Sequence, residues 1–201
     1  RGGGGEAGAG GGEQGGGGAA TAASPSEAVE MYLTALSEGD AEGALVFVDS
    51  YGDDTLLTQE VLDDSLSRAP ITDIVVDEDA TEGDYETTVS ATFTVGDVEV
   101  DRTFDVVNLS DEWVIYDGLI SVSIGSSFEG LDLAINGAEA PDSGYAFPGS
   151  YEFTVGREEF AIGGDVDSNV FTLATDDDRE QLYDLRPELS EEGTGPFRSL
   201  V

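Results

Sequence analysis

Residues 85–109 read YETTVSATFTVGDVEVDRTFDVVNL, and apolar and polar side chains alternate through most of this stretch. An alternation with a period of two places every second side chain on the same face of a β-strand. Gly96-Asp97 interrupts the alternation and predicts a tight turn between a strand that starts at Tyr85 and a strand from Val98 to Leu109. The stretch therefore predicts an antiparallel hairpin with one face against a core.

Helical signals precede this hairpin. The run SPSE, residues 24–27, places Ser24 as the N-cap, Pro25 at the first helical position and Glu27 three residues after the cap. That helix is expected to end at Gly39, and Asp40 is expected to cap a second helix. A third helix is predicted from about Thr58 to Arg68, because the proline at position 70 disfavours continuation. A first strand follows over residues 71–77.

A fourth strand is predicted at WVIYD, residues 113–117, with ISVSI, residues 120–124, as a possible continuation. Helices followed by a meander of antiparallel strands predict an α+β fold, in which N-terminal helices pack on a curved antiparallel sheet. Residues 24–121 are expected to form this domain.

FPGSYEFTV, residues 147–155, raises the question of whether the sheet continues or a second unit begins. Pro148-Gly149 predicts a corner, and the following residues alternate as a strand. We expect a small all-β module over about residues 126–178. The alternative is that these strands extend the first sheet. Residues 179–201 are expected to be a linker that leads to the start of a truncated C-terminal helical segment.

Two resemblances follow from these patterns. The opening EAVEMYLTALSEGDAEGAL (27–45) and the closing DEWVIYDG (111–118) resemble the NTF2-like superfamily of α+β cones, and in particular the NTF2-like domains of actinobacterial cell-envelope proteins. GLDLAING (130–137) and FPGSYEFTV resemble small β modules of the PEGA type. The first resemblance implies a location outside the cytoplasmic membrane, and an anchoring segment upstream of the printed chain.

Composition narrows the function. The chain carries 44 Asp and Glu against 7 Lys and Arg, all of them Arg, for a formal net charge of -37. Such a surface repels phosphate backbones, so no nucleic-acid partner is expected, and no polybasic cluster is present to hold an anionic lipid surface. We interpret the acidity as a solvating coat, of the kind left by salt adaptation or by a genome that uses Arg in place of Lys.

The chain contains no His and no Cys. Thiolate metal sites, Cys nucleophiles and His bases are therefore excluded, and no cofactor is expected. The Gly-rich residues 1–23 lack the Lys of a nucleotide-binding loop and are expected to be a flexible linker. Membrane contact is expected only through the missing N-terminal anchor.

NTF2-like folds hold a pocket between the first helix and the concave sheet face. The residues expected to line such a pocket are the aromatics Tyr32, Phe47, Tyr51, Phe93 and Trp113. Each of them also suits a plain core. No position matches a catalytic motif of the family, so no catalytic residue is assigned and no enzyme is expected.

DVDSN, residues 165–169, resembles the start of a calcium loop, with Asp176 at the twelfth position. Val170 replaces the glycine that the sharp turn of such a loop needs, so no metal site is assigned.

The sequence thus predicts a non-enzymatic, membrane-tethered binding or scaffolding protein of the cell envelope, with an unknown protein or envelope component as partner. Two alternatives stay open. One is a carrier of small apolar ligands or an isomerase-like enzyme that uses the cone. The other is a secreted acidic calcium-binding protein.

Overall fold

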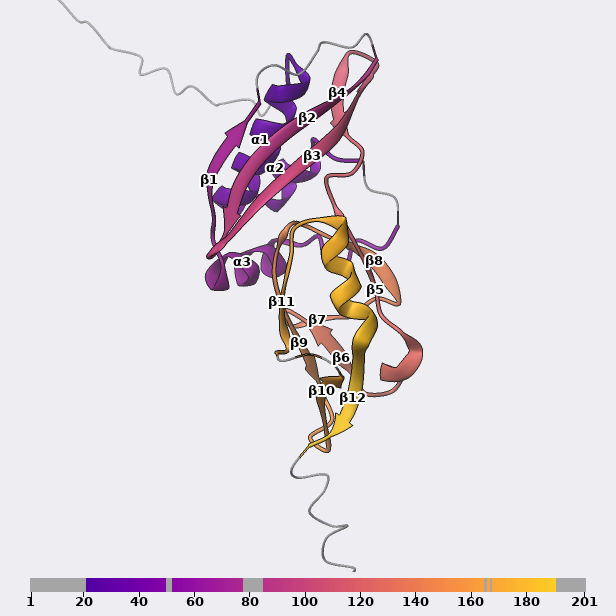
Figure 1. Cartoon of the computed structure of the whole chain (residues 1–201). Coiled ribbons are helices and arrows are strands. Elements are labelled where there is room, and N and C mark those ends of the chain that lie inside the picture. The colour runs from indigo at the N-terminus through magenta and orange to yellow at the C-terminus, as the bar shows by residue number, and fades with distance from the viewer. Residues whose placement is uncertain (1–20, 50–51, 78–84, 165, 167, 191–201) are drawn as a thin grey trace, which may run out of the picture.

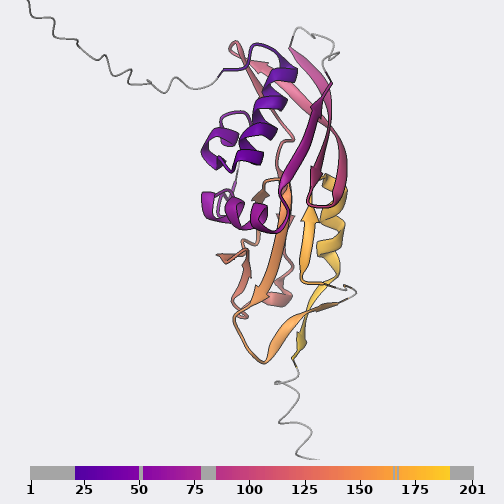
Figure 2. The same cartoon turned by 90° about the vertical axis from the view of Figure 1, so that its left-hand side faces the viewer.

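The computed structural model describes residues 21–49, 52–77, 85–164, 166 and 168–190. Tyr51, Asp165, Asp167, most of the predicted N-terminal linker and residues 191–201 lie outside the described residues. The described chain is α+β, with helices on one face of a curled antiparallel sheet that forms a half-barrel and with further strands below it (Figure 1; Figure 2).

The three α-helices of the described residues begin where the sequence predicts, and the first and the third also end there. They are α1 (Pro25–Glu38), α2 (Ala41–Leu45) and α3 (Gln59–Arg68). The side chains of Ser24, Asp40 and Thr58 each accept a backbone N–H in the first turn of their helix. Gly39 ends α1 in the left-handed region, at φ 73°. The predicted capping box is shifted, because the Glu27 carboxylate accepts the N–H of Ala23 and not that of Ser24.

The first sheet has the predicted meander topology. Its strands, in spatial order, are β1 (Ile71–Val76), β2 (Glu86–Val95), β3 (Val98–Leu109) and β4 (Glu112–Ile115), and each pair is antiparallel. The turn at residues 96–97 is confirmed, because Val95 pairs directly with Val98. A bulge interrupts the pairing of β1 between Thr72 and Val75, where Asp73 has a φ of 54°.

Burial confirms the predicted inward face of β2. Val89, Ala91, Phe93 and Val95 are all buried against the helices. Tyr85 belongs to the same face by its alternation, yet it is 60% exposed because it lies at the open end of the sheet. The first core therefore fills the space between α1 and the middle of the curled sheet.

The second half of the described chain is a set of short antiparallel pairings. A four-stranded sheet has the order β11 (Val170–Leu173), β9 (Gly149–Val155), β6 (Leu133–Ile135) and β7 (Ala138–Glu139). Two further pairs are β5 (Ile120–Ser123) with β8 (Ser143–Ala146), and β10 (Phe160–Gly164) with β12 (Leu185–Leu189). Two 3₁₀ segments, η1 (Ser126–Phe128) and η2 (Asp176–Asp184), connect them.

Three expectations for this half need correction. The segment ISVSI does not continue the fourth strand, because β5 pairs with β8 instead. The strands run from Ile120 to Leu189, beyond the expected 126–178. Residues 179–190 are not a linker, since η2 and β12 bury Leu182 and Leu185 in a second core. The low hydropathy of DDDREQ concealed this packing, because Leu182 is the one buried residue of η2.

Helix α3 lies between the two cores. Leu62 packs into the first core, while the adjacent Val61 packs into the second, together with Tyr151 and Phe153 of β9. The hydroxyl oxygen of Ser65 on α3 accepts the backbone N–H of Ser150 at 2.8 Å, and both side chains are buried. The helix therefore joins the curled sheet to the later strands.

Candidate functional site

The predicted pocket residues divide into a buried group and a rim residue. Tyr32, Phe47 and Phe93 are at most 4% exposed and lie in the first core. Trp113 is only partly buried and packs against the edge of that core. Tyr51 lies outside the described residues. The buried three therefore fill the space between the helices and the sheet, and Trp113 stands at its margin.

Tyr32 is fixed through its ring and its hydroxyl. The ring meets Phe104 edge to face, with the ring centroids 6.3 Å apart, and the hydroxyl donates to the carbonyl oxygen of Gly118 at 2.7 Å. Burial raises the pKa of Tyr32 far above its usual value, and the Arg102 cation opposes this shift only in part. The hydroxyl thus stays protonated and bound to the backbone.

Arg102 is the residue that sequence reasoning missed. It lies on β3 between Val100 and Phe104 and is 6% exposed, so a guanidinium occupies the inward face of the sheet. It donates to the backbone carbonyls of Asp117 and of Ala174, the second at 3.0 Å, and its charge lies 4.7 Å from the centroid of the Phe104 ring. The signal was present in the sequence, because position 102 has the parity of the apolar inward positions.

Asp117 completes this polar centre. Its carboxylate accepts the backbone N–H of Asp105 at 2.8 Å. Burial raises the pKa of Asp117, and the hydrogen bond from Asp105 and the Arg102 charge counteract that shift without cancelling it. The buried residues of β2 include no acid. The acid of this centre is Asp117, which follows β4 and was expected to be the last residue of the strand 113–117.

Tyr32, Arg102 and Asp117 all form hydrogen bonds with the backbone. The Tyr32 hydroxyl is bonded to a carbonyl, and the Arg102 guanidinium is bonded to two. A general base needs a substrate within hydrogen-bond reach, and Tyr32, Phe93 and Phe104 leave less than 2% of their surfaces accessible beside it. The polar centre therefore serves to join chain segments.

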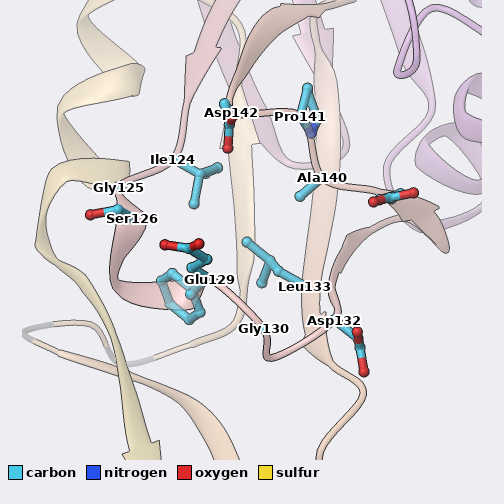
Figure 3. Close-up of a pocket in the computed structure, with 12 residues that line it drawn as sticks. Ile124, Gly125, Ser126, Glu129, Gly130, Asp132, Leu133, Ala140, Pro141 and Asp142 are labelled. Atoms are coloured by element: carbon cyan, nitrogen blue, oxygen red, sulfur yellow. The ribbon is translucent and has the colours of Figure 1, made fainter.

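A surface pocket of about 620 Å³ lies apart from this centre, between η1 and the β6–β7 hairpin. Figure 3 shows Ile124 and Leu133 pointing toward each other across it, while Asp132 points away. Glu129, Glu139 and Asp142 also line it, so apolar and acidic side chains share its lining. The acidic side chains disfavour anions.

The calcium-loop resemblance lies partly outside the described residues. Within them, the side-chain amide of Asn169 donates to the carbonyl of Phe153 at 3.1 Å, and Asp176 opens η2. In the part of the chain that the structure describes, no group of three or more acidic side chains is placed to hold a metal ion.

Comparisons with known proteins identify no relative from which a function could be transferred. No protein-family model, no curated protein and no solved structure matches the chain. Among the described residues, no helix is both long enough and apolar enough to cross a membrane.

Proposed function

We propose that this chain is a non-enzymatic binding or scaffolding protein of the cell envelope, held outside the membrane by an upstream segment. In this proposal the helices and the first sheet are an NTF2-like cone, and the strands from Ile120 onward are a small β module. The Gly-rich residues 1–23 act as the spacer that keeps the folded part away from its anchor.

The observation that carries the proposal is the filled interior. A carrier or an enzyme with an NTF2-like cone needs an enclosed cavity of several hundred Å³ beside the sheet. In this chain the space beside the sheet is occupied by three aromatic side chains that are each at most 1% exposed, Tyr32, Phe93 and Phe104. The surfaces left for binding are therefore on the outside of the molecule.

The contacts between α3 and the later strands, called here the joint between the two halves of the chain, support a scaffolding role. Arg68 of α3 donates to the side-chain oxygens of Asn136 and Glu152, each at 2.8 Å. The Asn136 amide in turn donates to the carbonyls of Val61 and Ser150. A joint with this many directional contacts holds the two halves in one orientation, as a scaffold requires.

An isomerase-like enzyme is the second candidate, and one observation favours it. Asp117 has a raised pKa and acts electrostatically on Tyr32, and a carboxyl beside a tyrosine is a known pairing for proton abstraction. This candidate requires the interior to open, because both groups are now engaged with the backbone.

The test uses the full-length protein in its native cells. Intact cells are treated with an external protease, and membrane and soluble fractions are then probed for the protein. The proposal predicts membrane-associated protein that the protease removes while a cytoplasmic marker survives. Protection of the protein in intact cells, or its recovery with the cytoplasmic marker, would contradict the proposed location.

A further inference from the structure

One row of side chains crosses the first sheet at the margin of the first core, at the end of the sheet where β2 begins and β3 ends. Asn108 of β3 pairs directly with Trp113 of β4. On its other side the backbone N–H of Asn108 bonds to the carbonyl of Tyr85 at 2.8 Å, which continues the pairing of Glu86 with Val107. Side chains of directly paired residues lie on the same face of a sheet. Tyr85, Asn108 and Trp113 therefore form one cross-strand row, called here the aromatic row.

The aromatic row lies on the concave face at the margin of the filled core, and the partly buried Trp113 packs against that core. Val106, two residues before Asn108, is completely buried, whereas Asn108 and Trp113 are half-buried and Tyr85 is 60% exposed. The two aromatic residues are separated by two strand spacings, about 10 Å. The row thus presents two aromatic side chains with an amide between them at the surface.

Three polar groups of the aromatic row are able to form a hydrogen bond with a ligand. The Asn108 side-chain oxygen accepts the N–H of Asp111, but within the described residues its amide nitrogen has no partner, and neither do the Tyr85 hydroxyl and the Trp113 indole N–H. Among the described residues, the one buried side-chain oxygen or nitrogen without a partner is Oδ2 of Asp49. The indole N–H of Trp113 is therefore open to solvent. The exposed ring of Tyr85, the partly exposed ring of Trp113 and three uncharged hydrogen-bonding groups therefore belong to one cross-strand row.

We propose that the aromatic row binds a neutral, extended glycan strand. The apolar face of a sugar ring stacks on an aromatic ring, and sugar hydroxyls accept from amide, indole and phenol donors. The spacing of the two aromatic residues suits two sugar rings separated along one strand. The net charge of -37 and the absence of any charged residue within the row disfavour acidic glycans and favour an uncharged one.

This inference rests on the proposed binding role and names the class of ligand. The chain offers its own reporter, because Trp113 is its only tryptophan. Tryptophan emission is recorded while the purified full chain is titrated with cellopentaose, with chitopentaose and with the acidic polygalacturonate oligomer. A saturable change is expected with at least one of the two neutral β-linked glycans.

The variants make the result specific. Tyr85→Ala removes an exposed ring and is expected to weaken binding roughly fivefold to tenfold, as the loss of one aromatic contact implies. Tyr183→Ala removes a ring with the same 60% exposure from η2 and is expected to bind like the unmodified chain. Circular dichroism confirms that both variants are folded.

Three results would overturn the aromatic row as a glycan site. They are no saturable change with either neutral glycan, equal weakening by Tyr85→Ala and Tyr183→Ala, and a response to polygalacturonate alone. Each of these leaves the protease experiment on intact cells unaffected, so failure of the glycan inference is distinguishable from failure of the proposed location.

Discussion

The guanidinium of Arg102 donates to the backbone carbonyl of Ala174 at 3.0 Å, across 72 residues of sequence. Arg102 belongs to β3 of the curled sheet, and Ala174 follows β11 of the later strands. A single buried cation therefore connects the two halves of the chain from inside, while α3 connects them through Ser65 and Arg68 at another place.

Replacement of Arg102 is expected to be costly. Arg102→Ala removes the donor from one buried and one partly buried carbonyl, so we expect a loss of about 3 kcal/mol in the free energy of unfolding. Arg102→Lys is expected to recover only part of this, because an ammonium lacks the planar fork that reaches two carbonyls. Urea denaturation followed by circular dichroism measures both.

The matched control is Arg157→Ala. Arg157 lies 3.4 Å from Asp132, but both side chains are more than half exposed. Exposed ion pairs contribute about 0.5 kcal/mol. If Arg102→Ala lowers the free energy of unfolding no more than Arg157→Ala does, Arg102 does not stabilise the contact between the two halves.

Ser65 and Gly149 are expected to be energetically coupled. A Cβ on residue 149 would overlap the Ser65 hydroxyl, the group that accepts the N–H of Ser150. Gly149→Ala should therefore destabilise the chain by roughly 2 kcal/mol, and by clearly less when Ser65→Ala has already removed the hydroxyl. A double-mutant cycle with no coupling between the two changes would show that α3 does not contact β9 in this way.

Asp117 is expected to make stability depend on pH. Its folded pKa is raised, so the folded chain keeps this proton at pH values where the unfolded chain has lost it. The contribution of Asp117 is thus fully present below the usual Asp pKa of about 3.9, and it is lost as pH rises through the folded pKa. Asp117→Asn keeps an oxygen that can accept from Asp105 but cannot ionise.

The measurement is the free energy of unfolding of the unmodified chain minus that of Asp117→Asn, from pH 3 to pH 8. This difference should fall as pH rises above about 4 and then become constant. Asp101→Asn changes the same formal charge on the exposed face of β3 and serves as the control. A difference that rises with pH would contradict the sign of the Asp117 shift.

Tyr32 is expected to resist ionisation until the fold opens. Burial raises its pKa, so alkaline pH should destabilise the chain as the unfolded state loses a proton that the folded state retains. Subtracting the absorbance titration of Tyr32→Phe at 295 nm from that of the unmodified chain isolates this residue. Its step should coincide with the loss of circular dichroism. A step well below that pH would mean that Tyr32 is accessible in the folded state.

The helices and the first sheet could be predicted because their signals are local. The caps at Ser24, Asp40 and Thr58 and the turn at residues 96–97 each act within a few residues. Alternation likewise gave the buried face of β2, since one buried side fixes the parity of a strand.

The joint and the later strands could not be predicted in the same way. Arg102 has the right parity for the core, but only the fold brings it to Ala174. Leu182 and Leu185 are the buried residues of an otherwise acidic segment, and the second core that they join also contains residues of β5, far away in the sequence. Asp117 becomes a half-buried acid only because the fold brings it close to Asp105 and Arg102.

The filled interior is the central claim, and binding of a fluorescent apolar ligand tests it most directly. The purified full chain is titrated with cis-parinaric acid at neutral pH, and the emission of the bound ligand is recorded. The account predicts no saturable binding, because Tyr32, Phe93 and Phe104 occupy the space beside the sheet. Saturable binding of one ligand per chain, displaced by an unlabelled fatty acid, would contradict it.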